Sequence, residues 1–128
     1  MRYLSTRGGG EPLHFKDTIL TGLARDGGLF LPEKIPNVSD RLAAWKKLTY
    51  QELAFEIIRL FADDIPEEAL HDLLTQSYAG FRHPEVTPVV KVGPVHVLEL
   101  FHGPTLAFKD VALQFLGNLF AYVLNETG

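Results

Sequence analysis

Residues 101–110 read Phe101-His102-Gly103-Pro104-Thr105-Leu106-Ala107-Phe108-Lys109-Asp110. In this stretch one lysine stands between an aromatic residue and a carboxylate, shortly after a Gly-Pro turn. A lysine amine becomes a useful nucleophile when its surroundings lower its pKa or hold it against a carbonyl carbon. Apolar neighbours and the positive end of a following helix both favour the neutral amine. Lys109 is therefore the first candidate for a reactive residue.

The competing interpretation of Lys109 is an ordinary solvated lysine near a helix start, since most lysines are exposed. Its local sequence favours function, because Leu106, Ala107 and Phe108 are apolar and the lysine follows a strand and a turn. Asp110 could orient the lysine electrostatically, or it could be an acidic residue that only complements the helix dipole.

The segments around this stretch predict a β-hairpin and a long helix. Residues 88–92 and 95–100 are rich in β-branched residues and flank Gly93-Pro94, which indicates two antiparallel strands. A helix is expected from about residue 108 to 124. Its apolar residues are Val111, Ala112, Leu113, Phe115, Leu116, Leu119, Phe120, Val123 and Leu124. They cover most of the helix circumference, so we expect burial on more than one side, or an exposed apolar face over 111–124 that favours self-association.

The first 87 residues are expected to be mainly helical. The expected elements are an extended arm over 1–13, a short helix over 14–23, a turn at Asp26-Gly27-Gly28, a short buried extended piece at 29–31, and a helix ending near Lys47 that is capped by Ser39 or Asp40. Thr49 and Glu52 have the spacing of a capping box. The next helix along the chain has Pro66 as a suitable first residue, and Gly80 closes it. Its inner face is formed by Leu70, Leu73, Leu74 and Tyr78. The predicted fold class is α+β, mainly helical with one hairpin.

Composition restricts the function classes. The 128 residues are 46% apolar and 22% charged, which is typical of a folded domain, and the net charge of −4 gives no reason to bind nucleic acid or an anionic membrane. No run approaches the length of a membrane span. The chain has no cysteine, which excludes disulfides and thiolate metal sites and fits a cytoplasmic location.

Other candidate residues carry weaker signals. Phe108 could pack on a cofactor ring, although a core phenylalanine is the favoured interpretation. Ser5, Thr6 and Arg7 precede a glycine cluster and could contact a phosphate group, or they could form an extended entry arm. His102 could donate a proton, although a structural or exposed loop histidine is favoured, and the five histidines lack the spacing of zinc ligands. For Thr105 a helix cap is favoured over a turn.

Residues 101–110 resemble, nearly letter for letter, the cofactor-lysine segment of the threonine synthase family. A second similarity lies near the N-terminus, in the same order and spacing as in that family. It consists of Tyr3-Leu4-Ser5-Thr6-Arg7-Gly8, then Phe15-Lys16-Asp17, then Gly22-Leu23-Ala24-Arg25-Asp26-Gly27-Gly28-Leu29-Phe30-Leu31-Pro32-Glu33. Residues 1–124 can be read throughout as the N-terminal portion of such a protein.

The resemblance implies a pyridoxal-phosphate-dependent carbon–oxygen lyase of fold type II, with two α/β lobes around the cofactor. Lys109 would hold pyridoxal 5'-phosphate as a Schiff base, Phe108 would lie beside it, and the amine would then shuttle protons. The substrate would be O-phospho-L-homoserine, and the products L-threonine and phosphate. The electron-sink chemistry would belong to the cofactor.

Family members continue for several hundred residues and include a glycine-rich loop that grips the cofactor phosphate. We therefore expect residues 1–87 to be the helical N-terminal region and 88–128 to begin an incomplete catalytic domain. This chain alone is expected to be inactive and to bind pyridoxal phosphate weakly or not at all. Two alternatives remain: a non-catalytic interaction module, and a phospholyase that resembles threonine synthase but acts on another phosphorylated substrate. The sequence does not assign roles to Arg7, Arg25, His102 or Asp110, nor an oligomeric state.

Overall fold

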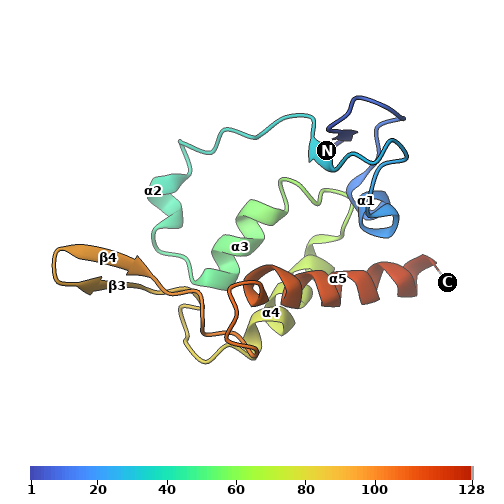
Figure 1. The fold of residues 1–128 in the computed structure, drawn as a ribbon. Helices are drawn as coiled ribbons and strands as arrows, with labels where there is room; N and C mark the ends of the chain where they lie inside the picture. The colour runs from blue at the N-terminus through green and yellow to red at the C-terminus, as the bar shows by residue number, and fades with distance from the viewer. Residues whose placement is uncertain (128) are drawn as a thin grey trace.

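The computed structural model describes residues 1–127, in which five helices and two two-stranded antiparallel sheets are present (Figure 1). In chain order the elements are β1 (Tyr3–Ser5), α1 (Phe15–Thr21), β2 (Phe30–Pro32), α2 (Leu42–Trp45), α3 (Tyr50–Ile58), α4 (Glu67–Ala79), β3 (Val89–Val92), β4 (Val95–Leu98) and α5 (Asp110–Thr127). The α+β class expected from the sequence is confirmed.

The core lies where α4 packs between α3 and α5. The apolar residues of α4 predicted for its inner face, Leu70, Leu73, Leu74 and Tyr78, are all buried. From α5, Leu119 and Val123 complete the same cluster. A polar link supports this packing, because the Tyr78 hydroxyl donates a hydrogen bond to the Val111 carbonyl over 3.0 Å.

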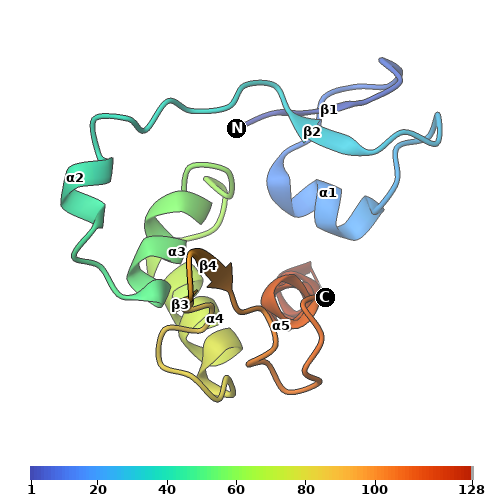
Figure 2. The same cartoon turned by 60° about the vertical axis from the view of Figure 1, so that its left-hand side comes forward.

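The N-terminal arm folds against this helical layer. β1 pairs with β2, with Tyr3 opposite Pro32 and Ser5 opposite Phe30. The Tyr3 hydroxyl donates to the Phe61 carbonyl over 2.9 Å, and helix α1 packs on α5. Figure 2 shows the long connection through α2 arching from the β1–β2 sheet to α3. The arm is thus held by contacts with residues more than 50 positions away in the sequence.

The predicted hairpin is present and projects away from the helices (Figure 1). Val89 lies opposite Leu98 and Val92 opposite Val95. Strand β4 ends at Leu98, two residues before the end of the strand expected over 95–100. All four of these apolar side chains are exposed. A two-stranded ribbon with exposed apolar residues gains little stability from its own contacts.

The helix-end signals had mixed outcomes. The capping box is confirmed, since Thr49 accepts from the Glu52 amide and the Glu52 carboxylate accepts from the Thr49 amide. The predicted caps at Ser39 and Asp40 are wrong: α2 begins only at Leu42, after Arg41. Ser39 instead donates both its amide and its hydroxyl to the Asn37 side chain, which closes a local turn.

Three further expectations need correction. Pro66 is the N-cap of α4 rather than its first helical residue, although Gly80 does close the helix. The extended piece at 29–31 is formed in part by β2, but Leu29 and Leu31 are exposed and not buried. Helix α5 begins at Asp110 rather than at 108. Within residues 1–127, no helix combines the length and hydropathy needed to cross a bilayer.

Candidate functional site at Lys109

Lys109 is the last residue before α5 and its side chain is exposed. Its carbonyl already belongs to the helix, because it accepts hydrogen bonds from the amides of Ala112 and Leu113 over 3.1 and 2.8 Å. Among the residues that the structure describes, no carboxylate forms an ion pair with the Lys109 amine. The backbone of this lysine is therefore fixed while its amine remains available.

The turn before Lys109 wraps around the side chain of Asp110. Asp110 is only 3% exposed. Its Oδ2 accepts from the Thr105 amide over 2.7 Å and from the Thr105 hydroxyl over 2.9 Å. Gln114, one turn along α5, donates to Oδ1 over 3.4 Å. These bonds hold residues 105–109 in a turn, which is why α5 does not extend back to Phe108.

The same bonds set the ionisation of Asp110. Burial raises the pKa of this carboxyl, but hydrogen bonds from the Thr105 amide and hydroxyl, from Gln114 and from the Leu106 amide lower it further than burial raises it. The net result is a pKa below the ordinary value of 3.8. Asp110 is thus a buried carboxylate whose charge is balanced by hydrogen bonds rather than by Lys109.

A hollow of about 530 Å³ lies beside Lys109. It is lined by Leu100, Phe108, Lys109, Val111, Ala112 and Leu113. Phe108 is 65% exposed, so the favoured interpretation of this residue as a core phenylalanine is wrong. An aromatic ring and aliphatic side chains around a single amine could accept a flat, apolar ring that carries an aldehyde.

Two other residues of the stretch have structural partners. Thr105 is part of the turn and not the cap of α5, contrary to the favoured interpretation. His102 lies 2.7 Å from the Glu99 carboxylate through Nε2 and packs on the ring of His83 at 5.0 Å between centroids. The structural interpretation of His102 therefore accounts for its contacts.

The candidate residues Ser5, Thr6 and Arg7 lie around the loop of Asp26, and the side chain of Ser5 contacts the Asp26 carboxylate. The Ser5 hydroxyl lies 2.7 and 2.8 Å from its two oxygens. The Arg7 guanidinium donates to the Asp26 carbonyl over 3.0 Å, while Thr6 accepts from the Leu29 amide. The Ser5 hydrogen bond, with others from the Gly28 and Gly9 amides, lowers the pKa of Asp26.

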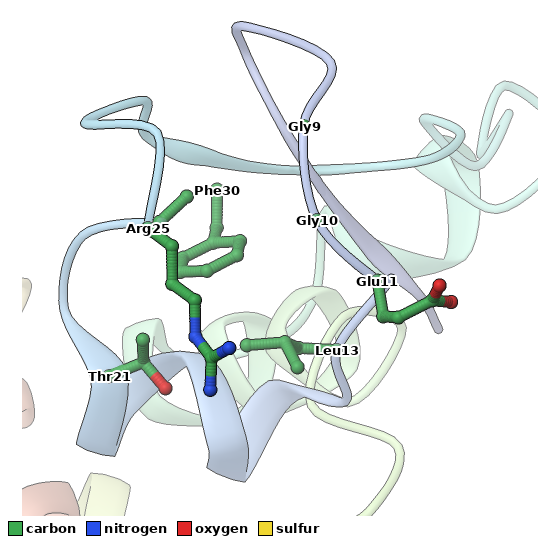
Figure 3. A pocket seen from close by; sticks show the side chains of 8 residues that line it. Gly9, Gly10, Glu11, Leu13, Thr21, Arg25 and Phe30 are labelled. Atoms are coloured by element: carbon green, nitrogen blue, oxygen red, sulfur yellow. The ribbon is translucent and has the colours of Figure 1, made fainter.

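A pocket of about 440 Å³ lies next to this loop (Figure 3). Arg25 extends its guanidinium toward Thr21 and Leu13, whereas the Glu11 carboxylate points away. In Figure 1 the β1–β2 sheet and α1 lie toward the C-terminal end of α5, where Lys16 pairs with Glu126, whereas the turn at Lys109 precedes the start of that helix. The structure therefore does not bring Ser5, Thr6 or Arg7 together with Lys109.

Sequence reasoning missed Asp26 as an acceptor and missed the close approach of Gly103 to Asp110. A Cβ atom built on Gly103 would collide with the Asp110 side chain, so glycine is required there. The pair Gly27-Gly28 after Asp26 was a usable signal, since Gly27 has a positive φ and a Cβ atom at Gly28 would collide with the Ser5 hydroxyl. Within residues 1–127, no group of three histidine, aspartate or glutamate side chains could hold a metal ion.

Comparison with known proteins identifies the family. A family model described as Threonine synthase N terminus matches residues 2–78. Threonine synthase from Schizosaccharomyces pombe is 52% identical over 97% of this chain and 25% of its own length. A structure of PLP-bound threonine synthase from Brucella melitensis aligns with a TM-score of 0.95 and 44% identity, covering 100% of this chain and 28% of that chain. A structure of yeast threonine synthase aligns with a TM-score of 0.91 and 49% identity, covering 98% of this chain and 27% of that chain.

The chain spans about a quarter of the length of the curated relatives it matches. The matches include the turn at Lys109, because each of these structural alignments covers at least 98% of this chain. Sequence identity, family model and backbone geometry agree on the assignment. The chain therefore belongs to the threonine synthase family and matches its N-terminal portion.

Proposed function

We propose that this chain supplies the cofactor lysine of a pyridoxal-phosphate-dependent carbon–oxygen lyase that converts O-phospho-L-homoserine and water to L-threonine and phosphate. The observation that carries the proposal is the available Lys109 amine, presented from a fixed turn at the rim of an apolar hollow. The PLP-bound relative from Brucella melitensis supports the choice of cofactor, and the names of the relatives support the reaction.

The residues around Lys109 fit the cofactor. The amine can bond to the aldehyde carbon, and Phe108 with Leu113 can contact the faces of the pyridine ring. When bound, pyridoxal phosphate supplies an electron sink for negative charge on substrate carbons. Lys109 then has a second task, because its amine, once free, can take and return protons at those carbons.

Ser5, Thr6 and Arg7 enter the proposal as contacts of a phosphate group on the substrate or cofactor. Their positive charge and hydroxyls support this role, while the neighbouring Asp26 carboxylate opposes it. In the whole enzyme, Arg7→Ala should raise KM for the phosphorylated substrate if the contact exists. An unchanged KM would restrict this loop to holding the N-terminal arm.

The 128-residue chain by itself is proposed to be inactive. The hollow at Lys109 has one charged lining residue and is open to solvent, which leaves a phosphate without a cradle of backbone amides.

We also propose that isolated chains self-associate through the exposed side of α5. A cytoplasmic location and a boundary between residues 87 and 88 in the whole enzyme complete the proposal, to be tested by cell fractionation and limited proteolysis.

The assay that tests the function uses the whole-length enzyme with O-phospho-L-homoserine. Release of phosphate and threonine in equal amounts, abolished by Lys109→Ala, is the expected result. Phosphate without threonine would favour the alternative, a phospholyase with another physiological substrate. Neither product, from a folded protein loaded with cofactor, would leave the non-catalytic interaction module as the better interpretation.

A further inference from the structure

Asp110 lies next to the proposed cofactor lysine but does not pair with it, and its own contacts point elsewhere. We propose that Asp110 and Thr105 form a clamp that fixes the direction in which Lys109 leaves the backbone, so that both act as positioning residues. This inference rests on the proposed function, since it concerns the aim of the lysine that would hold the cofactor.

The clamp has two bonds to one oxygen. The Thr105 amide and hydroxyl both donate to Asp110 Oδ2, over 2.7 and 2.9 Å. Hydrogen bonds to a charged and buried acceptor are stronger than those between neutral groups. Together they tie the start of the turn to the first residue of α5 across four intervening residues.

The chain between these two residues is held in an uncommon conformation. Leu106 has φ of 65°, in the left-handed region that non-glycine residues seldom adopt. Such a backbone persists only where its surroundings hold it, and here the Asp110 carboxylate is the acceptor at the centre of the turn. Ala107, Phe108 and Lys109 lie between the left-handed residue and the helix, so release of the clamp would change the direction in which Lys109 leaves the backbone.

Close packing on the other side of Asp110 supports the same role. Gly103 is buried and approaches the Asp110 side chain so closely that any Cβ there would collide with it. Gln114 contacts the second oxygen over 3.4 Å. Asp110 is therefore enclosed by residues from both ends of the turn, while the neighbouring Lys109 and Phe108 point outward and are exposed.

An acid that acted only through the helix dipole would need none of these contacts. A first-turn carboxylate serves the dipole equally well when exposed. Burial of Asp110 with convergent donors instead resembles an organising side chain of a turn. The inference is thus carried by geometry, and the direct electrostatic pairing of Asp110 with Lys109 is not needed.

The test uses variants of the exposed partner, because Asp110→Asn could unfold the turn altogether. Thr105→Val removes the hydroxyl at nearly constant shape, and Thr105→Ser keeps it. Thr75→Val, at an exposed site on α4 away from the turn, is the matched control. Each change is made in the 128-residue chain and in the whole-length enzyme loaded with pyridoxal phosphate.

Two readouts separate positioning from folding. Hydrogen exchange of the Thr105 and Leu106 amides, measured without cofactor, should become about tenfold faster in Thr105→Val, as expected for loss of one hydrogen bond to a charged group. In the loaded enzyme, kcat should fall by a similar factor with KM nearly unchanged, since the aim of the amine matters after substrate has bound. Thr105→Ser should recover both, and Thr75→Val should alter neither.

Faster exchange with unchanged kcat would overturn the inference, because the turn would then loosen without affecting the lysine. Unchanged exchange would also overturn it, since the clamp would not hold the turn. If wild-type enzyme never bonds pyridoxal phosphate at Lys109, the proposed function is wrong, and this inference is wrong as well. The exchange result would then describe a property of the turn alone.

Discussion

The side-chain amide of Asn118 on α5 donates to the hydroxyl of Ser77 on α4 over 3.0 Å. Ser77 is buried, and its hydroxyl donates a hydrogen bond to the Leu73 carbonyl over 2.6 Å. Asn118 also donates to the Gln114 carbonyl. This chain of hydrogen bonds joins the two central helices inside an otherwise apolar contact, so it contributes to their relative placement as well as to stability.

Removal of this link should destabilise the chain measurably. Ser77→Ala is expected to lower the free energy of unfolding by about 1 kcal/mol, since Asn118 loses one of two acceptors. Urea unfolding of Ser77→Ala, Asn118→Ala and the double variant measures the coupling between them. A coupling energy indistinguishable from zero would mean that the bond adds nothing to the α4–α5 contact. Thr75→Ala on the exposed side of α4 serves as control.

Two glycines should respond in opposite directions to alanine. Gly117 lies inside α5 with no atom within 4 Å of a built Cβ, so Gly117→Ala should stabilise the chain by about 0.5–1 kcal/mol. A Cβ at Gly28 would collide with the Ser5 hydroxyl, so Gly28→Ala should destabilise it by about 1–3 kcal/mol. Thermal unfolding of both variants checks the pair. Equal effects would contradict the described packing of the Asp26 cluster.

Acid should weaken the arm that contains Asp26. Its pKa is lowered below 3.8 in the folded state by the Ser5 hydrogen bond first, then by the Gly28 and Gly9 amides. A carboxyl with a lowered folded pKa adds stability above its unfolded pKa and loses it as the pH falls through the folded value. Stability should therefore decline from about pH 4 downward.

The variant Asp26→Asn isolates this contribution. The variant should be less stable than wild type at pH 7. It should also lose less free energy of unfolding on acidification, because residue 26 no longer carries a charge to titrate. Urea unfolding from pH 2 to pH 7 gives the comparison. Glu68→Gln, which removes an exposed carboxylate on α4, should leave the wild-type pH dependence in place. Parallel pH profiles for wild type and Asp26→Asn would contradict the account.

The outer side of α5 should cause self-association of the 128-residue chain. Leu113, Leu116, Phe120 and Leu124 are between 41% and 51% exposed and follow one another at helical spacing. Leu116→Gln is expected to shift the chain toward monomer in sedimentation velocity experiments. Leu31→Gln, on the exposed side of β2, is the matched control. A monomeric wild-type chain at high concentration would refute the prediction.

The sequence predicted the helices whose apolar residues repeat at regular intervals. Helix α4 packs against α3 and α5 through a single apolar face. The residues of that face, Leu70, Leu73, Leu74 and Tyr78, are therefore all buried in the core. The hairpin followed from β-branched runs around Gly93-Pro94. The exposure of the apolar side of α5 was one of two outcomes expected from its composition, and it is the one observed.

The features that sequence could not predict depend on distant contacts or on single turns. Ser39 has the chemistry of a cap, but Asn37 competes for its hydroxyl two residues away. Phe108 looks like a core residue by type, yet it lies in the turn before α5 and is exposed. Ser5 and Asp26 are in contact because β1 pairs with β2, and no local sequence pattern predicts that pairing.

The central claim is that Lys109 is the lysine that bonds the cofactor, and borohydride reduction tests it most directly. Whole-length enzyme is incubated with pyridoxal phosphate, reduced, digested and mapped, with the exposed Lys46 and Lys47 as internal references. The account predicts that Lys109 is labelled several-fold faster than either reference, and that this preference disappears in the 128-residue chain. Equal labelling of the three lysines in the whole-length enzyme would contradict it.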